Sequence, residues 1–432
     1  MHDLIVIGAG PSGYYAARKA AQSGKDVCLI EKEHLGGICL NKGCVPTKFL
    51  INTAEILSSI SKSARFGIDV ESYKINVKTM LERKDLIITQ HRQAIEKLLT
   101  RHKVRIIKSE ARLKDANTVE AAGEAVKAAN IIIATGSKDA ETGMLKFDHT
   151  RVLSSADMLS LKEIPKSLTI IGAGYIGCEF ACIYNRFGCD VTMIELQPQI
   201  LPGQDEEMAK RLMQSMQKRG IKISLNTKLN SLDDIKSEKV LLTIGRKPNI
   251  DNIGLEAAGI NVTKGAIEVD KNLRTNIKNI YAAGDVIGKY CLAYTAFYEG
   301  EVLADNIFGK PRTLNYGAVP ACIFTMPELA CVGLSQAQAK AQGYDIKTGS
   351  YPFMASSKAH IIDEIEGLVK LIIDAKAGSI LGAQILGPLA CELIHELVVA
   401  INKNMTAEEL AGTLHAHPTL AEALQDAAKN VK

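Results

Sequence analysis

Two cysteines and a lysine in one glycine-flanked stretch have the clearest potential for chemistry. Cys39 and Cys44 are five residues apart, and Lys48 follows four residues after Cys44. A disulfide needs Cα atoms about 4.4–6.8 Å apart, whereas a regular helix separates such a pair by about 7.5 Å along its axis alone. We therefore expect a helix that is distorted or begins between them, because Gly43 permits a turn and Pro46 suits a first helical turn. The spacing leaves two interpretations open: a redox-active disulfide beside a fixed cation, or two buried cysteines in a loop.

A histidine and a carboxylate near the C-terminus are a second candidate pair. Glu422 follows His417 by five residues, and Pro418 fixes the chain between them. A carboxylate that holds one imidazole nitrogen orients the other as a base. His417 is therefore a candidate general base, whereas we expect the neighbouring His415 to be structural.

These side chains need elements to position them, and the first is a dinucleotide-binding βαβ pattern. A short buried strand at residues 4–7 runs into Gly8, Gly10 and Gly13, then a helix, then a second strand that ends at Glu31. The glycines allow a tight turn and close approach of the backbone to a pyrophosphate, and the acid can bond a ribose. Because every part of the pattern is in place, we predict a bound dinucleotide rather than a glycine-rich turn.

The same unit recurs 164 residues later. Gly172, Gly174 and Gly177 follow another buried strand, and Glu195 ends the next strand without any insertion relative to the first unit. Two such units imply two dinucleotides held by two domains.

The remaining chain completes a predicted α/β fold. Residues 58–100 are expected to be helical, and buried strands that end in small residues are expected at 130–136, 239–246 and 279–285. From residue 316 strand-like and helical segments mix without a glycine motif. We therefore predict two Rossmann-like domains and a C-terminal α+β domain.

Composition excludes several classes of protein. The 432 residues carry a net charge of only +4, which gives no reason to expect a nucleic-acid or membrane partner. No apolar run approaches the roughly 18–20 residues of a transmembrane helix. Because the chain enters a strand almost at once, there is no room for a signal peptide, and we expect a cytoplasmic location. Ten cysteines in this length are not a secreted disulfide framework. In a reducing compartment we expect a bonded pair to be catalytic rather than structural.

The chain resembles the flavin-dependent disulfide reductases, the class I pyridine nucleotide-disulfide oxidoreductases, over nearly its whole length. The resemblance rests on the two glycine motifs with their acids, the cysteine stretch, the segment from Tyr281 to Asp285 and the terminal His-x-His-Pro-Thr-x-x-Glu. Within the family it is strongest to the dihydrolipoamide dehydrogenases. It implies an FAD-binding domain at 1–145 and 271–315, an NAD-binding domain at 146–270 and a dimerisation domain at 316–432.

The resemblance also implies two sets of cofactor-binding residues. FAD would contact Gly8, Gly10, Gly13, Glu31, Lys48, Ala111, Gly136, Asp285 and Ala293. NAD would contact Gly172, Gly174, Tyr175, Ile176, Gly177, Glu195, Gly245 and Arg246. The carboxylate of Glu195 favours NAD, because it accepts from a ribose hydroxyl and repels a 2′-phosphate. No metal site is expected, and we interpret Cys178, Cys182 and Cys189 as core packing.

The resemblance assigns roles to the catalytic residues. Cys39 would exchange with the substrate dithiol, and Cys44 would face the flavin as a thiolate, stabilised by a helix N-terminus and a cation. Lys48 would lie near the flavin and pair with Glu179; the alternative is a solvated lysine. His417, oriented by Glu422, would be the general base and would reach the disulfide of the other subunit, so that the active site exists only in a homodimer.

The implied reaction is oxidation of protein-bound dihydrolipoamide to lipoamide with NAD⁺ through the disulfide and FAD. Lipoyl domains of a dihydrolipoyl acyltransferase or the glycine cleavage H protein would be partners, and cell redox homeostasis the wider role. Two alternatives are an NAD(P)H-dependent reductase of another disulfide and a non-catalytic scaffold.

Two departures from the family stand out. The second dinucleotide domain is short between Asn226 and Lys239, where we expect a trimmed edge or a hairpin. Tyr294 stands where lipoamide-specific members usually have histidine, which puts the flavin potential in question.

Overall fold

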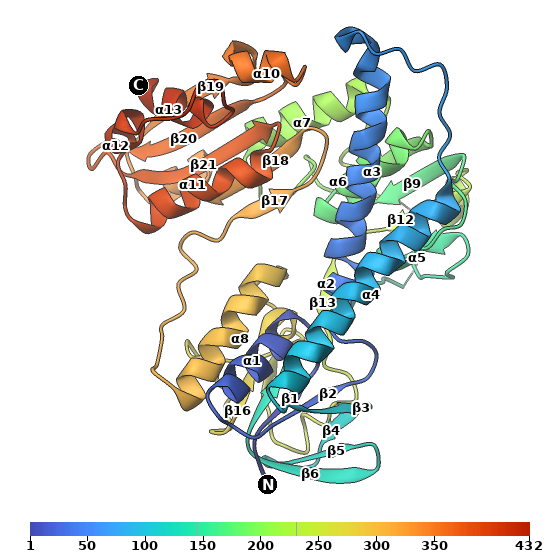
Figure 1. The fold of residues 1–432 in the computed structure, drawn as a ribbon, viewed down its shortest axis with the longest axis vertical. Helices are drawn as coiled ribbons and strands as arrows, with labels where there is room; N and C mark the ends of the chain where they lie inside the picture. Colours follow the sequence, from blue (N-terminus) through green and yellow to red (C-terminus); the bar gives the residue numbers. More distant parts are fainter. Residues whose placement is uncertain (144, 230) are drawn as a thin grey trace.

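The computed structural model describes residues 1–143, 145–229 and 231–432. Figure 1 shows three sheet-based regions: one beside the N-terminus, one on the far side of the long helices α3 and α4, and one ending at the C-terminus. The bounds of these two helices are α3 (Cys44–Lys62) and α4 (Val77–Arg101).

The first sheet has seven strands and is parallel at its centre. β1 pairs in parallel with both β2 and β6, while β4 and β5 extend the sheet as an antiparallel ribbon. β16 comes from much later in the chain yet pairs with β6, so the sheet draws on two separate segments. The strands are β1 (His2–Ile7), β2 (Val27–Glu31), β3 (Arg105–Lys108), β4 (Ala111–Leu113), β5 (Thr118–Ala121), β6 (Glu124–Ile133) and β16 (Ile280–Ala282). The domain boundaries at 145, 270 and 315 stay predictions.

Two helices cover one face of this sheet. α1 (Pro11–Gln22) packs on α8 (Ala293–Phe308), and both lie over the sheet in Figure 1. β1 and β2 are apolar on both faces, as expected for parallel strands covered by helices.

The second sheet repeats the parallel arrangement with five strands, in the order β11-β10-β9-β12-β8. Its strands are β8 (Val152–Leu153), β9 (Ser167–Ile171), β10 (Asp190–Ile194), β11 (Lys222–Ser224) and β12 (Lys239–Leu242), and its helices are α5 (Ser155–Met158), α6 (Tyr175–Arg186) and α7 (Glu206–Lys218). Between β11 and β12 the described residues form one 3-10 turn, η2 (Leu232–Asp234), and no strand. The expected trimmed edge is therefore present, and the hairpin is not.

The third sheet is antiparallel, in the order β17-β18-β21-β20-β19. Its strands are β17 (Ala321–Ile323), β18 (Glu328–Gly333), β19 (Ile346–Pro352), β20 (Leu368–Asp374) and β21 (Ile380–Gly387), and its helices are α9 (Gln336–Ala341), α10 (Ser357–Ile361), α11 (Ala390–Asn402), α12 (Ala407–Gly412) and α13 (Glu422–Lys429). This is the predicted α+β region.

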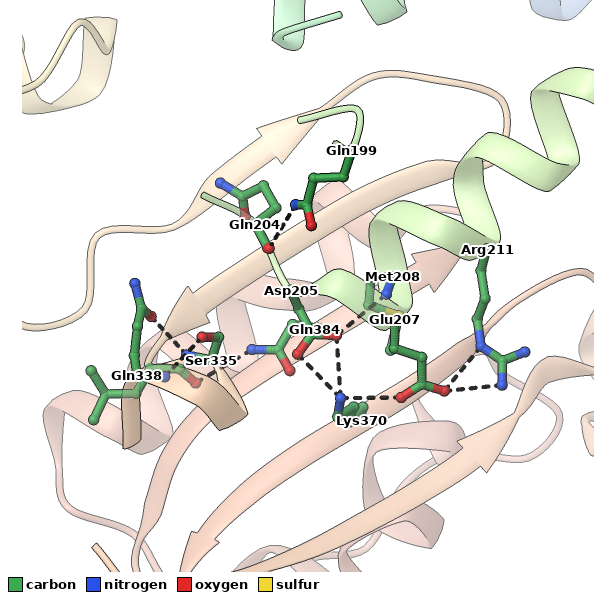
Figure 2. Close-up of polar contacts among 11 residues, drawn as sticks. Gln199, Gln204, Asp205, Glu207, Met208, Arg211, Ser335, Gln338, Lys370 and Gln384 are labelled. Atoms are coloured by element: carbon green, nitrogen blue, oxygen red, sulfur yellow. Dashed lines mark hydrogen bonds and ion pairs between the residues drawn. The ribbon is translucent and has the colours of Figure 1, made fainter. Parts of the chain in front are cut away.

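A buried ion cluster joins the third sheet to the second domain (Figure 2). The Lys370 ammonium of β20 contacts the carboxylates of Asp205 and Glu207 at 3.1 Å each, at the start of α7. Asp205 also caps α7 by accepting from the Met208 N–H. Lys370 and Asp205 are buried, whereas Glu207 is exposed. Because removing one partner of a buried ion pair leaves a costly unpaired charge, the Lys370–Asp205 pair stabilises this junction only while both residues are present.

The prediction of continuous helix over residues 58–100 is wrong. α3 ends at Lys62, a 3-10 turn follows, and Gly67 then adopts a φ of +74°. A loop runs to Asn76, whose side chain caps α4 by accepting from the Thr79 N–H. The glycine and the capping asparagine explain the interruption.

In residues 1–143, 145–229 and 231–432, every helix is too short or too polar to cross a membrane.

Candidate active site

The two cysteines lie on either side of a break between helices. α2 (Gly37–Lys42) ends at Gly43, which has φ −143° and ψ −111°, and α3 begins at Cys44. A Cβ atom on Gly43 would lie 3.0 Å from the Ile38 carbonyl oxygen, so the break suits glycine. The expected helix start between Cys39 and Cys44 is confirmed, and it places Cys44 at a helix N-terminus.

The structure holds the two cysteines as a dithiol. The Cys39 thiol donates a hydrogen bond to the Cys44 sulfur, and this bond lowers the pKa of the Cys44 thiol; the Lys48 ammonium lowers it further. The same hydrogen bond, followed by burial, raises the pKa of Cys39 well above its ordinary value. The pair is therefore asymmetric, because the Cys44 thiol ionises more readily than the Cys39 thiol.

The predicted ion pair between Lys48 and Glu179 is present. The Lys48 ammonium lies 2.8 and 2.9 Å from the two carboxylate oxygens of Glu179. α3 packs on α6, the helix that carries this buried glutamate. Phe324, which sequence reasoning missed, donates its backbone N–H to Glu179 at 3.0 Å and places its ring 4.5 Å from the ammonium. The lysine is thus held by contacts from two other domains.

The first glycine motif forms a cradle with one open position. A Cβ on Gly8 would lie 2.4 Å from the Ala134 carbonyl oxygen, and one on Gly13 would lie 1.9 Å from the Gly8 carbonyl oxygen. At Gly10, in contrast, no atom lies within 4 Å of an added Cβ. Two glycines therefore serve the packing of the turn, and the third leaves backbone open to a ligand.

Glu31 closes this cradle. One carboxylate oxygen accepts from the Ala9 N–H at 2.7 Å and the other from the Glu33 N–H at 2.8 Å. A carboxylate has about four lone-pair sites, so two remain for ribose hydroxyls. The open glycine, the bare N-terminus of α1 and this carboxylate fit the adenosine diphosphate part of FAD.

The other predicted FAD residues lie on several elements. Asp285, in the 3-10 turn η3 (Gly284–Ile287), accepts from the Ser137 hydroxyl at 2.5 Å, and burial raises its pKa. Gly136 has a φ of +72° with open space beside it. Ala293 is the first residue of α8, and Ala111 is the first of β4; both are half-buried. Ser137 is a further polar residue here that sequence reasoning missed.

The second glycine motif repeats the first in detail. Cβ atoms on Gly172 and Gly177 would lie 2.4 Å from the Thr243 carbonyl oxygen and 2.1 Å from the Gly172 carbonyl oxygen, whereas Gly174 is open. Glu195 accepts from the backbone N–H groups of Ala173 at 2.6 Å and Gln197 at 2.8 Å. These residues fit a second dinucleotide in the same way.

A cavity of about 210 Å³ lies beside the second motif. Its walls include the predicted NAD residues Gly174, Tyr175, Ile176 and Gly245. Gly245 has a φ of +120° and open space at its Cα, which suits close approach of a ligand.

The Arg246 side chain contacts residues of the first domain. Its guanidinium donates to the Ser137 hydroxyl and carbonyl oxygens and contacts the Asp139 carboxylate. These contacts pair β13 (Arg246–Pro248) with β7 (Ser137–Asp139). The Arg246 side chain therefore links the first two domains, and its predicted contact with NAD stays a prediction.

The predicted pair near the C-terminus is also formed. His417 Nδ1 lies 2.8 Å from a Glu422 carboxylate oxygen, and the histidine side chain is 70% exposed. The other Glu422 oxygen accepts from the Thr419 N–H at 2.8 Å; this bond and then that of His417 lower the pKa of Glu422. His415 is instead buried, with Nε2 3.0 Å from Glu396, which fits the expected structural role.

The single chain does not unite the two halves of the site. Within residues 1–143, 145–229 and 231–432, no hydrogen bond or ion pair links His417 or Glu422 to Cys39 or Cys44. Figure 1 shows α12 and α13 at the outer edge of the third region, well away from α2.

The remaining predictions concern side chains near these elements. Cys178, Cys182 and Cys189 are buried in the core of the second domain, as expected. The Tyr294 hydroxyl donates to the Pro320 carbonyl oxygen, between α8 and the third region.

Known proteins resemble this chain over its full length. Residues 2–300 match the family described as pyridine nucleotide-disulphide oxidoreductase, and residues 319–428 match the dimerisation domain of that family. A dihydrolipoyl dehydrogenase of Geobacillus stearothermophilus is 40% identical over 449 residues, which cover 99% of this chain and 95% of the relative. One of Bacillus subtilis (strain 168) is 40% identical over 450 residues, which cover 99% and 96%.

Solved structures of two other proteins have a similar fold. The HOCl-induced flavoprotein disulfide reductase RclA from Escherichia coli has a TM-score of 0.91 at 28% identity, with 100% of both chains covered. LpdA from Mycobacterium tuberculosis has a TM-score of 0.92 at 28% identity, with 99% of both chains covered.

Proposed function

The chain belongs to the pyridine nucleotide-disulphide oxidoreductase family, and we propose that within it the chain oxidises dihydrolipoamide to lipoamide with NAD⁺. It is an oxidoreductase with FAD and NAD as cofactors, in common with its full-length relatives. The observation that carries the proposal is the Cys39–Cys44 pair, which lies at the N-terminus of α3 beside the Lys48–Glu179 ion pair.

The proposed reaction begins with the two cysteines as a disulfide. A thiolate of dihydrolipoamide attacks the Cys39 sulfur, and Cys44 leaves as a thiolate, which the start of α3 and the Lys48 ammonium stabilise. The second substrate thiol gives its proton to His417 Nε2 and attacks the substrate sulfur bound to Cys39. Cys39 leaves as a thiolate and takes the proton back from His417. This step releases cyclic lipoamide and leaves the reduced dithiol that the structure holds.

FAD supplies the two-electron chemistry that reoxidises the dithiol and passes a hydride to NAD⁺. The chain contributes the open backbone at Gly10 and the carboxylate of Glu31 for FAD, and Gly174 with Glu195 for NAD. Because the Glu195 carboxylate is buried and would repel a 2′-phosphate, the second site favours NAD over NADP.

The base belongs to a second subunit in this proposal. The chain carries a dimerisation domain, and His417 is exposed there together with Leu414, which is 96% exposed. Met354, Ile361, Leu389 and Val399 are further exposed apolar residues of the same domain. The dimerisation domain supports a homodimer, in which we place His417 and Glu422 of one subunit facing the cysteines of the other.

Lipoyl groups on larger proteins are the proposed natural substrates. A dihydrolipoyl acyltransferase of a 2-oxoacid dehydrogenase complex or the H protein of glycine cleavage would present them. We also propose a cytoplasmic location, because ten cysteines spread over 432 residues are not a secreted disulfide framework.

A second candidate is a reductase of another disulfide. It is favoured by the similarity to the reductase RclA, which covers both chains completely. The preference of Glu195 for NAD argues against the NADPH-driven form of this activity.

Steady-state assays separate the two candidates. FAD-loaded protein is assayed with dihydrolipoamide and NAD⁺, and separately with NADPH and glutathione disulfide. We expect turnover in the first assay, and loss of that turnover in Cys44→Ser. No turnover in the first assay together with clear turnover in the second would overturn the proposal in favour of the alternative.

A further inference from the structure

A second pair of neighbouring thiols lies outside the site described above. Cys322 is the middle residue of β17, and Cys391 lies in the first turn of α11. The Cys322 sulfur is 3.8 Å from the Cys391 carbonyl oxygen, and the Cys391 sulfur is 3.8 Å from the Ile323 carbonyl oxygen. The Cys391 thiol also donates a hydrogen bond to the Cys322 sulfur. Each sulfur therefore lies beside the backbone of the other strand or helix, and the two thiols are neighbours.

A carboxylate accompanies this pair. Glu328, the first residue of β18, accepts from the Cys391 backbone N–H at 2.8 Å and from the Cys391 thiol. Burial raises the pKa of Glu328, so it binds a proton more readily than an exposed glutamate. The Cys391 proton thus has two acceptors, the Cys322 sulfur and the Glu328 carboxylate.

The two sulfurs are unequal in exposure and in charge. Cys391 is buried, whereas Cys322 is partly exposed. The hydrogen bond from Cys391 lowers the pKa of Cys322, and the same bond followed by burial raises the pKa of Cys391. This is the asymmetry of an attacking thiolate with a resolving thiol behind it.

We propose that Cys322 and Cys391 form a second disulfide-exchange site, which takes a low-molecular-weight disulfide such as glutathione disulfide. The Cys322 thiolate attacks one sulfur, the disulfide bond of the ligand breaks, and the first glutathione leaves and takes up the Cys322 proton from solvent. Cys391 then passes its proton to Glu328 and attacks the Cys322 sulfur. The Cys322–glutathione bond breaks, and the second glutathione leaves as a thiolate that takes the proton from Glu328. Two protein thiols become one disulfide, and one glutathione disulfide becomes two glutathione molecules.

This site is next to the first one but shares no residue with it. Cys322 lies two residues before Phe324, whose ring covers Lys48. Cys331, the nearest other thiol in the sheet, donates to the Gln204 side-chain oxygen at 2.7 Å instead. A disulfide between Cys322 and Cys391 would tie β17 to α11.

The test uses FAD-loaded, dimeric protein with Cys39→Ser and Cys44→Ser, so that the first site cannot react. The protein is incubated with glutathione disulfide, quenched with acid, alkylated and mapped by peptide mass spectrometry. We expect a linked peptide pair containing Cys322 and Cys391, with both glutathione molecules released. In protein that also carries Cys391→Ala, the reaction should stop at a mixed disulfide between glutathione and Cys322, and only one glutathione molecule should be released.

Two further variants sharpen the result. Glu328→Gln should slow the second release by about 10²-fold, the usual contribution of a general base, and leave the first unchanged. Cys331→Ala is the matched control and should change nothing. The proposal would be overturned if Cys322 of the Cys39→Ser, Cys44→Ser protein did not react. It would also be overturned if glutathione were found on other cysteines while Cys322 was recovered in its alkylated form. Because the linked peptide is sought in the starting protein, misfolding of the Cys391 variant would not obscure the outcome.

Discussion

At the scale of single residues, the site depends on the contacts that position Lys48 and His417. Lys48 is fixed by Glu179 and by the ring of Phe324, and His417 is fixed by Glu422. Both contacts, Lys48–Glu179 and His417–Glu422, were predicted from sequence. Phe324 and Ser137 could not be, because their contacts with Glu179 and Arg246 join different domains, which no local pattern encodes.

The hydrogen bond between the two cysteines gives a pH prediction. Because the bond from Cys39 lowers the pKa of Cys44, the Cys44 thiolate persists to lower pH than an ordinary thiolate and is lost as the pH falls through that lowered pKa. Cys39→Ala removes the donor, so the thiolate should disappear at a higher pH. The measurement is a pH titration of the long-wavelength absorbance that a thiolate gives beside oxidised flavin. Cys39→Ser keeps a donor and should shift the titration less; equal titrations in all three proteins would contradict the assignment.

His417 gives a prediction that separates two half-reactions. His417→Gln should lower turnover of dihydrolipoamide by about 10²–10⁴-fold, because it removes the general base. Reduction of the flavin by NADH should keep its rate, because that step does not use the histidine. Stopped-flow absorbance measures both. His415→Gln is the control: it removes a buried contact with Glu396 and should reduce thermal stability more than turnover.

At the scale of elements, the sequence predicts most of the framework. Glycine spacing locates both βαβ units, because the first and third glycine of each motif have no room for a Cβ atom and the second is open. The break at Gly43 was expected, whereas the interruption after α3 was not, since helical periodicity resumes beyond it. β18 and β19 were missed, because the pairing that stabilises these strands is with distant strands of the third sheet.

The glycine duties can be tested with a matched pair. Gly13→Ala places a methyl group 1.9 Å from the Gly8 carbonyl oxygen, so we expect a poorly folded first domain and a markedly lower melting temperature. Gly10→Ala meets open space in the chain, so the fold should persist while FAD affinity falls. Circular dichroism and flavin fluorescence distinguish the two. A Gly10→Ala protein with unchanged FAD affinity would show that the cofactor does not approach this position.

At the scale of the whole molecule, the proposed active site requires two subunits. The order of motifs predicted three domains, but no feature of a single chain shows whether the third domain meets the cysteines of a partner. That arrangement depends on an interface between copies, which sequence periodicity does not describe.

Mixed dimers test the shared site. His417→Gln and Cys44→Ser proteins are each expected to be inactive. A dimer with one subunit of each kind has two shared sites. In one of them the intact His417 of the Cys44→Ser subunit faces the intact Cys44 of the His417→Gln subunit. After dissociation and random reassociation, activity should return to about a quarter of the wild-type value, since about half of the dimers are mixed and each has one working site. Size-exclusion chromatography confirms dimer formation. Full activity of a monomer would contradict a shared site.

The most direct measurement is anaerobic reduction of the FAD-loaded protein by dihydrolipoamide, followed by absorbance. Substrate should reduce the enzyme by two electrons and produce a long-wavelength band from the Cys44 thiolate beside the flavin, and NAD⁺ should then remove the electrons. In Cys44→Ser the band should be absent. If dihydrolipoamide leaves the flavin spectrum of the wild-type protein unchanged while NADPH with another disulfide turns over, the proposed substrate is wrong.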